Sequence, residues 1–218
     1  MKDKLTVLVN TCDKYEFLWS DFKNLFDKNF PTELNLDVCL LSQTKTSSLF
    51  DKCFTPGPIE FSKAVEHALN KIDTPYFLWL QDDYFIDSKL TSKELQRYLM
   101  LVEKYKMDRL GICETSDHYT MNRLQDGEDE LYKFHPRSLY TMSLQASIFR
   151  KEWMLDIIND QTWNPWQLEL TGSDMINRFG KSAHIYMVHR YFYSEAKRKG
   201  KDTDFYKVYK MYKQFLKK

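Results

Sequence analysis

Apolar runs and helical spacings alternate along the first half of the chain. Runs rich in Leu and Val predict buried strands at residues 4–13, 34–43, 74–83 and 109–115. Apolar positions at helical spacing predict helices at residues 15–29, 55–73 and 92–106. This strand–helix alternation predicts an α/β fold with a Rossmann-type, mainly parallel sheet and covering helices in a single domain.

The second half of the chain is less regular. Residues 126–136 predict a loop or hairpin, residues 138–158 a strand that passes into a helix, and residues 164–180 a turn followed by a short helix. Alternation over residues 182–194 predicts a late strand. The segment from Thr203 to the C-terminus predicts an amphipathic helix with Phe and Tyr on one face and Lys toward the other.

Polar residues follow each of the four strands predicted in the first half. Ligands of parallel sheets bind at the edge formed by the carboxyl ends of the strands, so we expect a site there. The residues at these ends are Thr11-Cys12-Asp13, Ser42-Gln43-Thr44, Gln81-Asp82-Asp83 and Glu114-Thr115-Ser116.

The composition is that of a globular protein with a substantial core, since 43% of the 218 residues are hydrophobic. The sequence contains neither an apolar run of membrane-spanning length nor a secretory signal. Its four cysteines are scattered without a CxxC pair, which predicts free thiols in a reducing cytoplasm and argues against a zinc site.

Charge is unevenly distributed. From Arg190 to Lys218 there are ten Lys or Arg against three acids, so this segment carries +7 and the rest −6, given the total of +1. Such a basic segment suggests an anionic partner, such as a membrane surface at the inner face of the cell, a phosphate or a nucleic acid. A solvated helix face explains the same lysines equally well, and no nucleic-acid-binding motif is present.

Asp82 and Asp83 are the last two residues of the predicted strand segment 74–83. Ionised carboxylates next to a core are costly unless a positive group or solvent meets them. Two carboxylates at a strand end suit Mg²⁺ or Mn²⁺, which prefer oxygen ligands and also take phosphate oxygens. The alternative is an exposed turn with ordinary acids.

Four segments resemble, in order and spacing, the landmarks of GT-A type glycosyltransferases, nearest to bacterial enzymes of surface-polysaccharide synthesis. They are VLVNTCDKYE (7–16), FSKAVEHALNKIDTPYFLWLQDDYFI (61–86), YTMSLQASIFRKEWM (140–154) and NPWQLELTGSDMINRFG (164–180). The resemblance spans about residues 4–200. It implies a nucleotide-binding half (1–113), an acceptor half (114–200) and a basic C-terminal helix (201–218).

The resemblance also implies roles at the donor side. Gln81-Asp82-Asp83 occupies the DxD slot, so Asp83 would ligate Mn²⁺ or Mg²⁺ and Asp82 would lie near the ribose or donor sugar. Gln81 replaces the first aspartate, which puts strict metal dependence in doubt. The other implied donor-binding residues are Thr11, Asp13, Ser42 and Gln43 around the nucleoside, and Arg190, Lys197 and Arg198 at the diphosphate.

For the acceptor side, the resemblance implies that Glu169 is the catalytic base, with Asp174 as the alternative. A cap or ion pair would explain Glu169 equally well. His189 corresponds to a third metal ligand, although a lone histidine at a strand end is more often hydrogen-bonded or exposed. Trp166 is predicted to bind the acceptor, because indole rings commonly line sugar sites, and Glu114 is predicted to bind it as well. Large aromatic residues also serve as core.

The predicted function is transfer of a sugar from a nucleotide-diphosphate donor to a hydroxyl of a glycan or lipid-linked acceptor, with inversion because no nucleophile is evident. A nucleotidyltransferase acting on sugar phosphates is one alternative, but NTCDKYE lacks the glycine-rich phosphate loop usual in such enzymes. A nucleotide- or carbohydrate-binding protein without turnover is another.

Overall fold

A nine-stranded sheet forms the centre of the molecule. The computed structural model describes residues 1–113, 121–126, 129–134, 140–179, 185–188 and 192–216. The strand order is β3-β2-β1-β4-β9-β6-β10-β8-β7. The strands are β1 (Leu5–Asn10), β2 (Val38–Leu41), β3 (Lys52–Phe54), β4 (Tyr76–Gln81), β6 (Arg109–Gly111), β7 (Met121–Asp126), β8 (Asp129–Phe134), β9 (Ser147–Arg150) and β10 (Ile185–Val188).

The sheet is mainly parallel, as the sequence predicts. The four strands β3, β2, β1 and β4 are parallel neighbours, and β6 is parallel to β10. One strand of the second half, β9, lies antiparallel between β4 and β6. The sheet therefore joins the two halves of the chain, and β7 and β8 extend it as the hairpin expected near residues 126–136.

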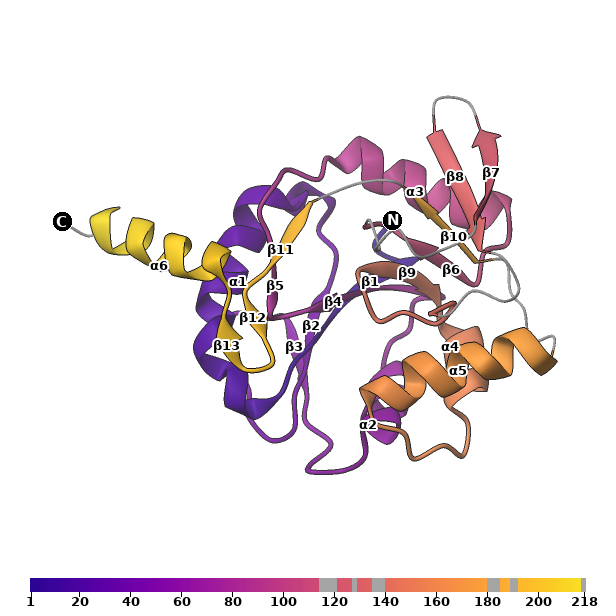
Figure 1. Cartoon of the computed structure of the whole chain (residues 1–218), viewed down its shortest axis with the longest axis horizontal. Coiled ribbons are helices and arrows are strands. Elements are labelled where there is room, and N and C mark those ends of the chain that lie inside the picture. Colours follow the sequence, from indigo (N-terminus) through magenta and orange to yellow (C-terminus); the bar gives the residue numbers. More distant parts are fainter. Residues whose placement is uncertain (114–120, 127–128, 135–139, 180–184, 189–191, 217–218) are drawn as a thin grey trace.

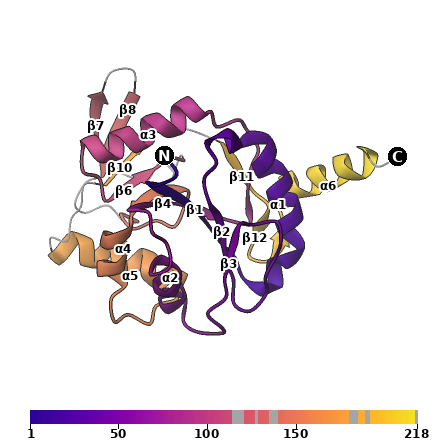
Figure 2. The same cartoon turned by 180° about the vertical axis from the view of Figure 1, so that it is seen from behind.

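Helices cover both faces of the sheet. Side chains of successive strand residues point to opposite faces, so a strand made entirely of apolar residues needs a covering layer on each face. Along β1, Val7 and Val9 join a core with α1 (Glu16–Asn29), α3 (Ser92–Lys104) and α6 (Asp204–Leu216). Leu8 joins a second core with α2 (Phe61–Leu69), α4 (Lys151–Ile158) and α5 (Pro165–Phe179). Figures 1 and 2 show α2, α4 and α5 grouped together, away from α1.

Helix α5 is longer than the short helix predicted, at 15 residues. The side chain of Asn164 accepts the backbone N–H of Gln167, and the Gln167 side chain accepts the N–H of Asn164, both at 2.9 Å. This reciprocal cap starts the helix at Pro165, a residue suited to a first helical position. The Asn-Pro pair thus begins the helix instead of forming a separate turn.

The late strand predicted over residues 182–194 is two strands. β10 belongs to the main sheet, whereas β11 (Tyr193–Glu195) pairs antiparallel with β5 (Tyr84–Ile86). A hairpin of β12 (Lys197–Arg198) and β13 (Lys201–Asp202) follows. Its two-residue turn has positive φ at Lys199 (50°) and Gly200 (77°), as a tight hairpin requires. Helix α6 then projects from the body of the molecule (Figure 1).

Ser62 ties α2 to the segment before α5. Its hydroxyl donates to the carbonyl of Gln161 at 2.7 Å and accepts the N–H of Trp163 at 2.9 Å, and the residue has no exposed surface. Removal of this hydroxyl leaves two backbone groups without their partner. We expect Ser62→Ala to lower the free energy of unfolding by about 1–3 kcal/mol, measured by urea titration.

The matched control is Ser20→Ala, at an exposed position of α1. Alanine favours helices, so this variant is expected to unfold at the wild-type urea concentration or higher. Equal stabilities for the two variants would contradict the role assigned to Ser62.

Candidate active site

The carboxyl ends of β1, β2 and β4 form one edge of the sheet, here called the rim. The N–H of Thr11 donates to the carbonyl of Leu41 at 2.9 Å, and the N–H of Asp82 donates to the carbonyl of Asn10 at 3.2 Å. The predicted residues Thr11, Asp13, Ser42, Gln43, Gln81, Asp82 and Asp83 are thereby brought together. Donor binding by the first six of these residues and metal binding by Asp83 remain predictions.

Asp82 lies beneath the rim, with 2% of its surface exposed. Its carboxyl group accepts the hydroxyl of Thr11, and that hydroxyl oxygen accepts the indole N–H of Trp19 at 2.9 Å. Burial raises the pKa of Asp82 well above its ordinary value; the Thr11 hydrogen bond opposes this and the charge of Asp83 adds to it. This carboxyl group therefore links β4, β1 and α1.

Asp83 is the more exposed residue of the pair. Its pKa is raised to about 6, mainly by burial and also by the carboxylate of Glu195, while a backbone hydrogen bond and the ammonium of Lys14 act in the opposite direction. The backbone carbonyl of Asp83 accepts the N–H of Ala196 at 2.6 Å. This contact fixes the turn between β4 and β5, so that Asp83 is the carboxylate better placed to reach a ligand.

Asp13 binds the loop that follows β2. Its carboxylate accepts the N–H groups of Gln43 at 3.0 Å, Thr44 at 3.1 Å and Lys45 at 3.3 Å, and the Thr44 hydroxyl at 2.5 Å. Desolvation alone would raise the pKa of Asp13, but the hydrogen bonds from Thr44, Lys45 and Gln43 together outweigh it, so the pKa is lowered. The carboxylate of Asp13 thus shapes the rim through the loop of residues 43–45.

The two candidate bases lie on different faces of α5. Glu169 accepts the N–H of Leu144 at 2.8 Å, next to β9, and burial raises its pKa. Asp174 is exposed and forms an ion pair with Arg178 at 2.6 Å, one turn further along the helix. Only Glu169 of the two is directed toward the segment that precedes β9.

Three predicted site residues, Glu114, His189 and Arg190, lie outside the described residues. Within the described ranges, no group of three or more His, Cys, Asp or Glu side chains could hold a metal ion. Asp83, with Glu195 beside it, still offers carboxylate oxygens of the kind that Mg²⁺ or Mn²⁺ combines with phosphate oxygens and water. The residues present fit a cation of this class, and the metal remains a prediction.

The predicted cations near the diphosphate differ in accessibility. Lys197 pairs with Asp202, and only 11% of its side chain is exposed. The Arg198 side chain is 76% exposed and pairs with Glu195 at 2.7 Å. Lys14, which the sequence analysis did not single out, is exposed and acts on the pKa of Asp83. The signal available in the sequence was its position next to Asp13, in the segment that follows β1.

Of the two tryptophans near the start of α5, Trp166 is 73% exposed, whereas Trp163 packs against the core that contains α2 and α5. The exposed side chain of Trp166 is accessible to an acceptor. Its role in acceptor binding stays a prediction. Trp163 serves the core, as large aromatic residues often do.

A cluster of uncharged polar side chains lies beside Gln81 and was missed by sequence reasoning. Tyr193 donates its hydroxyl proton to Gln145, and the Gln145 amide donates to the hydroxyl of Tyr84 at 3.4 Å. The two tyrosine rings meet edge to face at 5.0 Å. Burial raises the pKa of Tyr84 to about 12. These residues come from β5, β11 and the segment before β9, and no motif connects them in the sequence.

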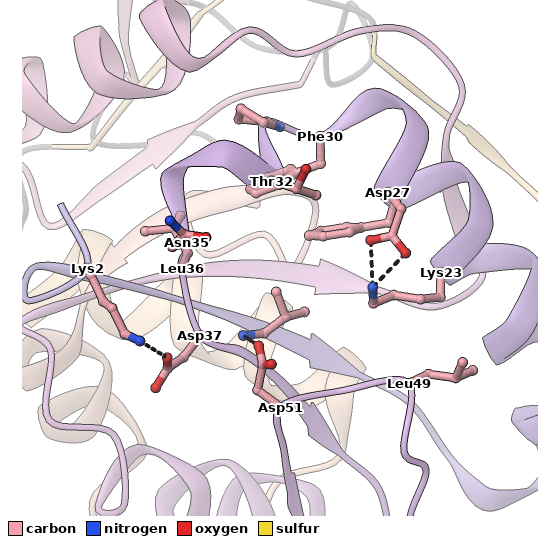
Figure 3. A pocket seen from close by; sticks show the side chains of 13 residues that line it. Lys2, Lys23, Asp27, Phe30, Thr32, Asn35, Leu36, Asp37, Leu49 and Asp51 are labelled. Carbon is pink, nitrogen blue, oxygen red and sulfur yellow. Dashed lines mark hydrogen bonds and ion pairs between the residues drawn. The ribbon is translucent and has the colours of Figure 1, made fainter.

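A separate cavity of about 340 Å³ lies at the amino end of β2, away from the rim. Figure 3 shows Lys2 reaching Asp37 and Lys23 reaching Asp27, at 3.2 and 2.5 Å. Asp51 accepts the N–H of Val38 at 2.8 Å. These charged groups are engaged with one another or with the backbone, so the cavity has no evident ligand.

Three lysines of α6 form ion pairs, one of them within the helix and two with residues outside it. Lys207 pairs with Asp204 at 2.8 Å, Lys210 with Asp202, and Lys213 with Asp21. None of the helices in the described part of the chain is long and apolar enough to cross a membrane. Contact of α6 with an anionic membrane surface remains a prediction.

Replacement of Asp83 by asparagine should change how stability depends on pH. The folded-state pKa of about 6 exceeds the ordinary value of 3.8, so the folded protein binds more protons between these values. Wild-type stability therefore falls as pH rises through this window, and the cost is complete above it. We expect Asp83→Asn to be more stable than wild type by about 1–3 kcal/mol at pH 7.5, with the difference shrinking toward pH 4.5.

Urea unfolding of both proteins across this pH range checks the expectation. Asp3→Asn, which removes an exposed carboxylate, is the matched control and should follow the wild-type curve. A constant offset between the Asp83→Asn and wild-type curves would contradict the raised pKa.

Comparison with known proteins finds likeness at the level of structure. No family model matches the chain, and no curated protein matches it. S. aureus TarS residues 1–349 in complex with UDP-GlcNAc superposes with a TM-score of 0.58 at 16% identity, over 95% of this chain and 65% of that structure. S. aureus TarS residues 1–349 in complex with UDP superposes with a TM-score of 0.53 at 16% identity, over 87% of this chain and 59% of that structure.

The CMP:2-keto-3-deoxy-manno-octonic acid synthetase complexed with CTP gives a TM-score of 0.53 at 10% identity, over 97% of this chain and 99% of that chain. The chain spans only about two thirds of the TarS structure. At these identities the likeness concerns the fold. With its mainly parallel sheet and helices on both faces, the chain has the GT-A-type α/β fold.

Proposed function

We propose that the protein transfers a sugar from a nucleotide-diphosphate donor to a hydroxyl group of a glycan or lipid-linked acceptor. The observation that carries this proposal is the relative position of two carboxylates. Asp83 lies at the end of β4, and Glu169 is bound to Leu144 beside β9, the strand next to β4. A fold shared with a protein that binds UDP-GlcNAc supports it.

The donor lies along the rim in this proposal. The nucleoside contacts the ends of β1 and β2, where Thr11, Ser42 and Gln43 lie and where Asp13 orders the loop. Asp83 would hold Mn²⁺ or Mg²⁺, and the cation would offset the charge of the diphosphate leaving group. Lys14 and Arg198 supply further positive charge, which matters more because Gln81 occupies the place of a carboxylate.

Glu169 acts as the base. The acceptor oxygen attacks the anomeric carbon, its proton passes to Glu169, and the bond from that carbon to the diphosphate oxygen breaks. The nucleoside diphosphate leaves, and the configuration at the anomeric carbon is inverted. Burial, which raises the pKa of Glu169, makes its carboxylate a stronger base, while the N–H of Leu144 fixes its orientation. Trp166, on the same helix, is the acceptor contact.

A nucleotidyltransferase acting on a sugar phosphate is the second candidate. Likeness to the synthetase complexed with CTP, over nearly the full length of both chains, favours it. The segment from Asn10, the last residue of β1, to Glu16 contains no glycine for a phosphate loop. Release of pyrophosphate from a nucleoside triphosphate would identify this activity, whereas release of a nucleoside diphosphate identifies sugar transfer.

The donor site is tested by melting temperature in the presence of UDP, GDP, ADP or CDP, each with and without Mn²⁺. We expect one diphosphate to raise the melting temperature, because it binds only the folded protein, and Mn²⁺ to enlarge the shift. In Asp83→Asn the enlargement by Mn²⁺ should disappear. A full Mn²⁺ effect in this variant would remove Asp83 from the metal site, and no response to any diphosphate would overturn the proposed function.

The base is tested by Glu169→Gln, which retains an oxygen for the N–H of Leu144 but accepts a proton poorly. We expect kcat for sugar transfer to fall by about 100-fold or more, with donor affinity within about threefold of wild type. Asp174→Asn, which removes the exposed carboxylate of the same helix, is the control and should retain kcat. Unchanged turnover in Glu169→Gln would assign the base elsewhere.

A further inference from the structure

A buried arginine lies in the main sheet. Arg109, the first residue of β6, has no exposed surface. Its guanidinium carbon lies 5.5 Å from the ring centre of Phe134 and 5.8 Å from that of Phe149. Both rings belong to the core that contains α2, α4 and α5, so Arg109 points to the face of the sheet that α5 covers. A guanidinium stays protonated in proteins, so this face carries a fixed, buried positive charge.

Arg109 binds both ends of the segment of residues 141–147, here called the arch. Its Nε donates to the hydroxyl of Ser147 at 3.2 Å, and its Nη1 donates to the carbonyl of Thr141 at 3.3 Å. The hydroxyl of Ser147 in turn donates to the carbonyl of Gln145 at 2.8 Å. The guanidinium thereby closes the arch at the point where the chain enters β9.

Helix α5 binds the arch from the other side. Three polar side chains spaced four residues apart lie on one face of this helix, namely Glu169, Ser173 and Asn177. They accept hydrogen bonds of 2.8, 2.9 and 3.1 Å from three groups of the arch, which are the N–H of Leu144, the N–H of Met142 and the hydroxyl of Thr141. The arch therefore lies between Arg109 and the face of α5 that carries Glu169.

The charge of Arg109 acts on Glu169 across the arch. Burial raises the pKa of Glu169, whereas the N–H of Leu144, the charge of Arg109 and the hydroxyl of Ser143 lower it. In the described part of the chain no other charged side chain has such an effect. In particular, none comes from the two helices packed against α5, whose charged or titratable residues are Lys63, Glu66, His67, Lys151, Glu152 and Asp156. Arg109 also lowers the pKa of Cys113, but burial raises that pKa to about 11, so the thiol stays neutral at acidic and neutral pH.

Resting on the proposed role of Glu169 as the base, we propose that Arg109 is a positioning residue of the transferase. Its guanidinium orders the arch that binds Glu169 and keeps this buried side chain in the carboxylate form, which accepts the proton of the acceptor. Charges interact more strongly in a protein interior than in water, so a buried cation behind one chain segment is effective. Burial makes Glu169 a stronger base, and Arg109 limits how far burial can favour its protonated form.

Arg109→Gln and Arg109→Lys separate the charge of Arg109 from its contacts. Both variants shorten the side chain, but only Arg109→Gln removes the charge. The titration of Glu169 is followed by NMR of ¹³C-labelled glutamate carboxyl groups, and Glu169→Gln identifies its resonance. We expect Glu169 to titrate at higher pH in Arg109→Gln than in the wild type, and near the wild-type pH in Arg109→Lys. An unchanged titration in Arg109→Gln would overturn the inference and leave the proposed function intact, because this measurement needs no substrate.

The pH profile of kcat for sugar transfer is the second readout. A base acts only when it is deprotonated, so loss of the cation should move the acid limb of the profile to higher pH. We expect kcat of Arg109→Gln to be about 10-fold below wild type at the acid end and within about threefold at alkaline pH. An equal loss at every pH in both Arg109 variants would indicate a purely structural role and overturn the inference. A shifted titration without a shifted profile would remove Glu169 as the base, and the role of Arg109 in the reaction with it.

Arg178→Gln is the matched control, because it removes an exposed cation from the same helix as Glu169. It should retain both the wild-type titration and the wild-type profile. If Arg109→Gln does not fold, Arg109→Met takes its place with the same expectations, since Phe134 and Phe149 offer apolar surface to an uncharged side chain.

Discussion

Asp82 brings a carboxyl group beneath the end of the sheet, where water is almost absent. Desolvation of such a group is costly, and the hydroxyl of Thr11, itself held by Trp19, compensates for part of the cost. Since these residues belong to β1, α1 and the end of β4, the interaction fixes where β4 stops. The chain then turns, and Asp83 lies at the rim. The N–H of Ala196, which follows β11, donates a hydrogen bond to the backbone carbonyl of Asp83.

Ionised carboxylates at the rim and next to it therefore lower the free energy of unfolding of the ligand-free protein. Burial raises the pKa values of Asp82, Asp83 and Glu169, and a neighbouring carboxylate adds to the increase at Asp82 and at Asp83. Such unfavourable arrangements concentrate at functional sites, because groups that are poorly satisfied in the free protein can be satisfied by a ligand. Asp13 contrasts with them: its pKa is lowered by the loop it binds, and its role is already fulfilled without a ligand.

Much of the fold could be predicted from the sequence. The long apolar runs of β1 and β4 and the helical spacing of α1 and α3 are strong periodic signals, and the polar residues after these strands identified the rim. Strands of three residues, such as β3, β5 and β11, are too short to show a period. The insertion of β9 between β4 and β6 depends on contacts between distant segments, which local patterns do not encode. For the same reason the cluster of Tyr84, Gln145 and Tyr193 was missed, since its members meet only after folding.

The position of β9 also bears on synthesis of the protein. A nascent chain that has emerged as far as β6 contains β4 and β6 but not the strand that lies between them. Until β9 leaves the ribosome, the facing edges of these strands have no native partner, and unpaired strand edges invite association with other chains. Production of residues 1–113 alone would make this condition permanent, so we expect this part of the chain not to fold as a separate unit despite its regular alternation of strands and helices.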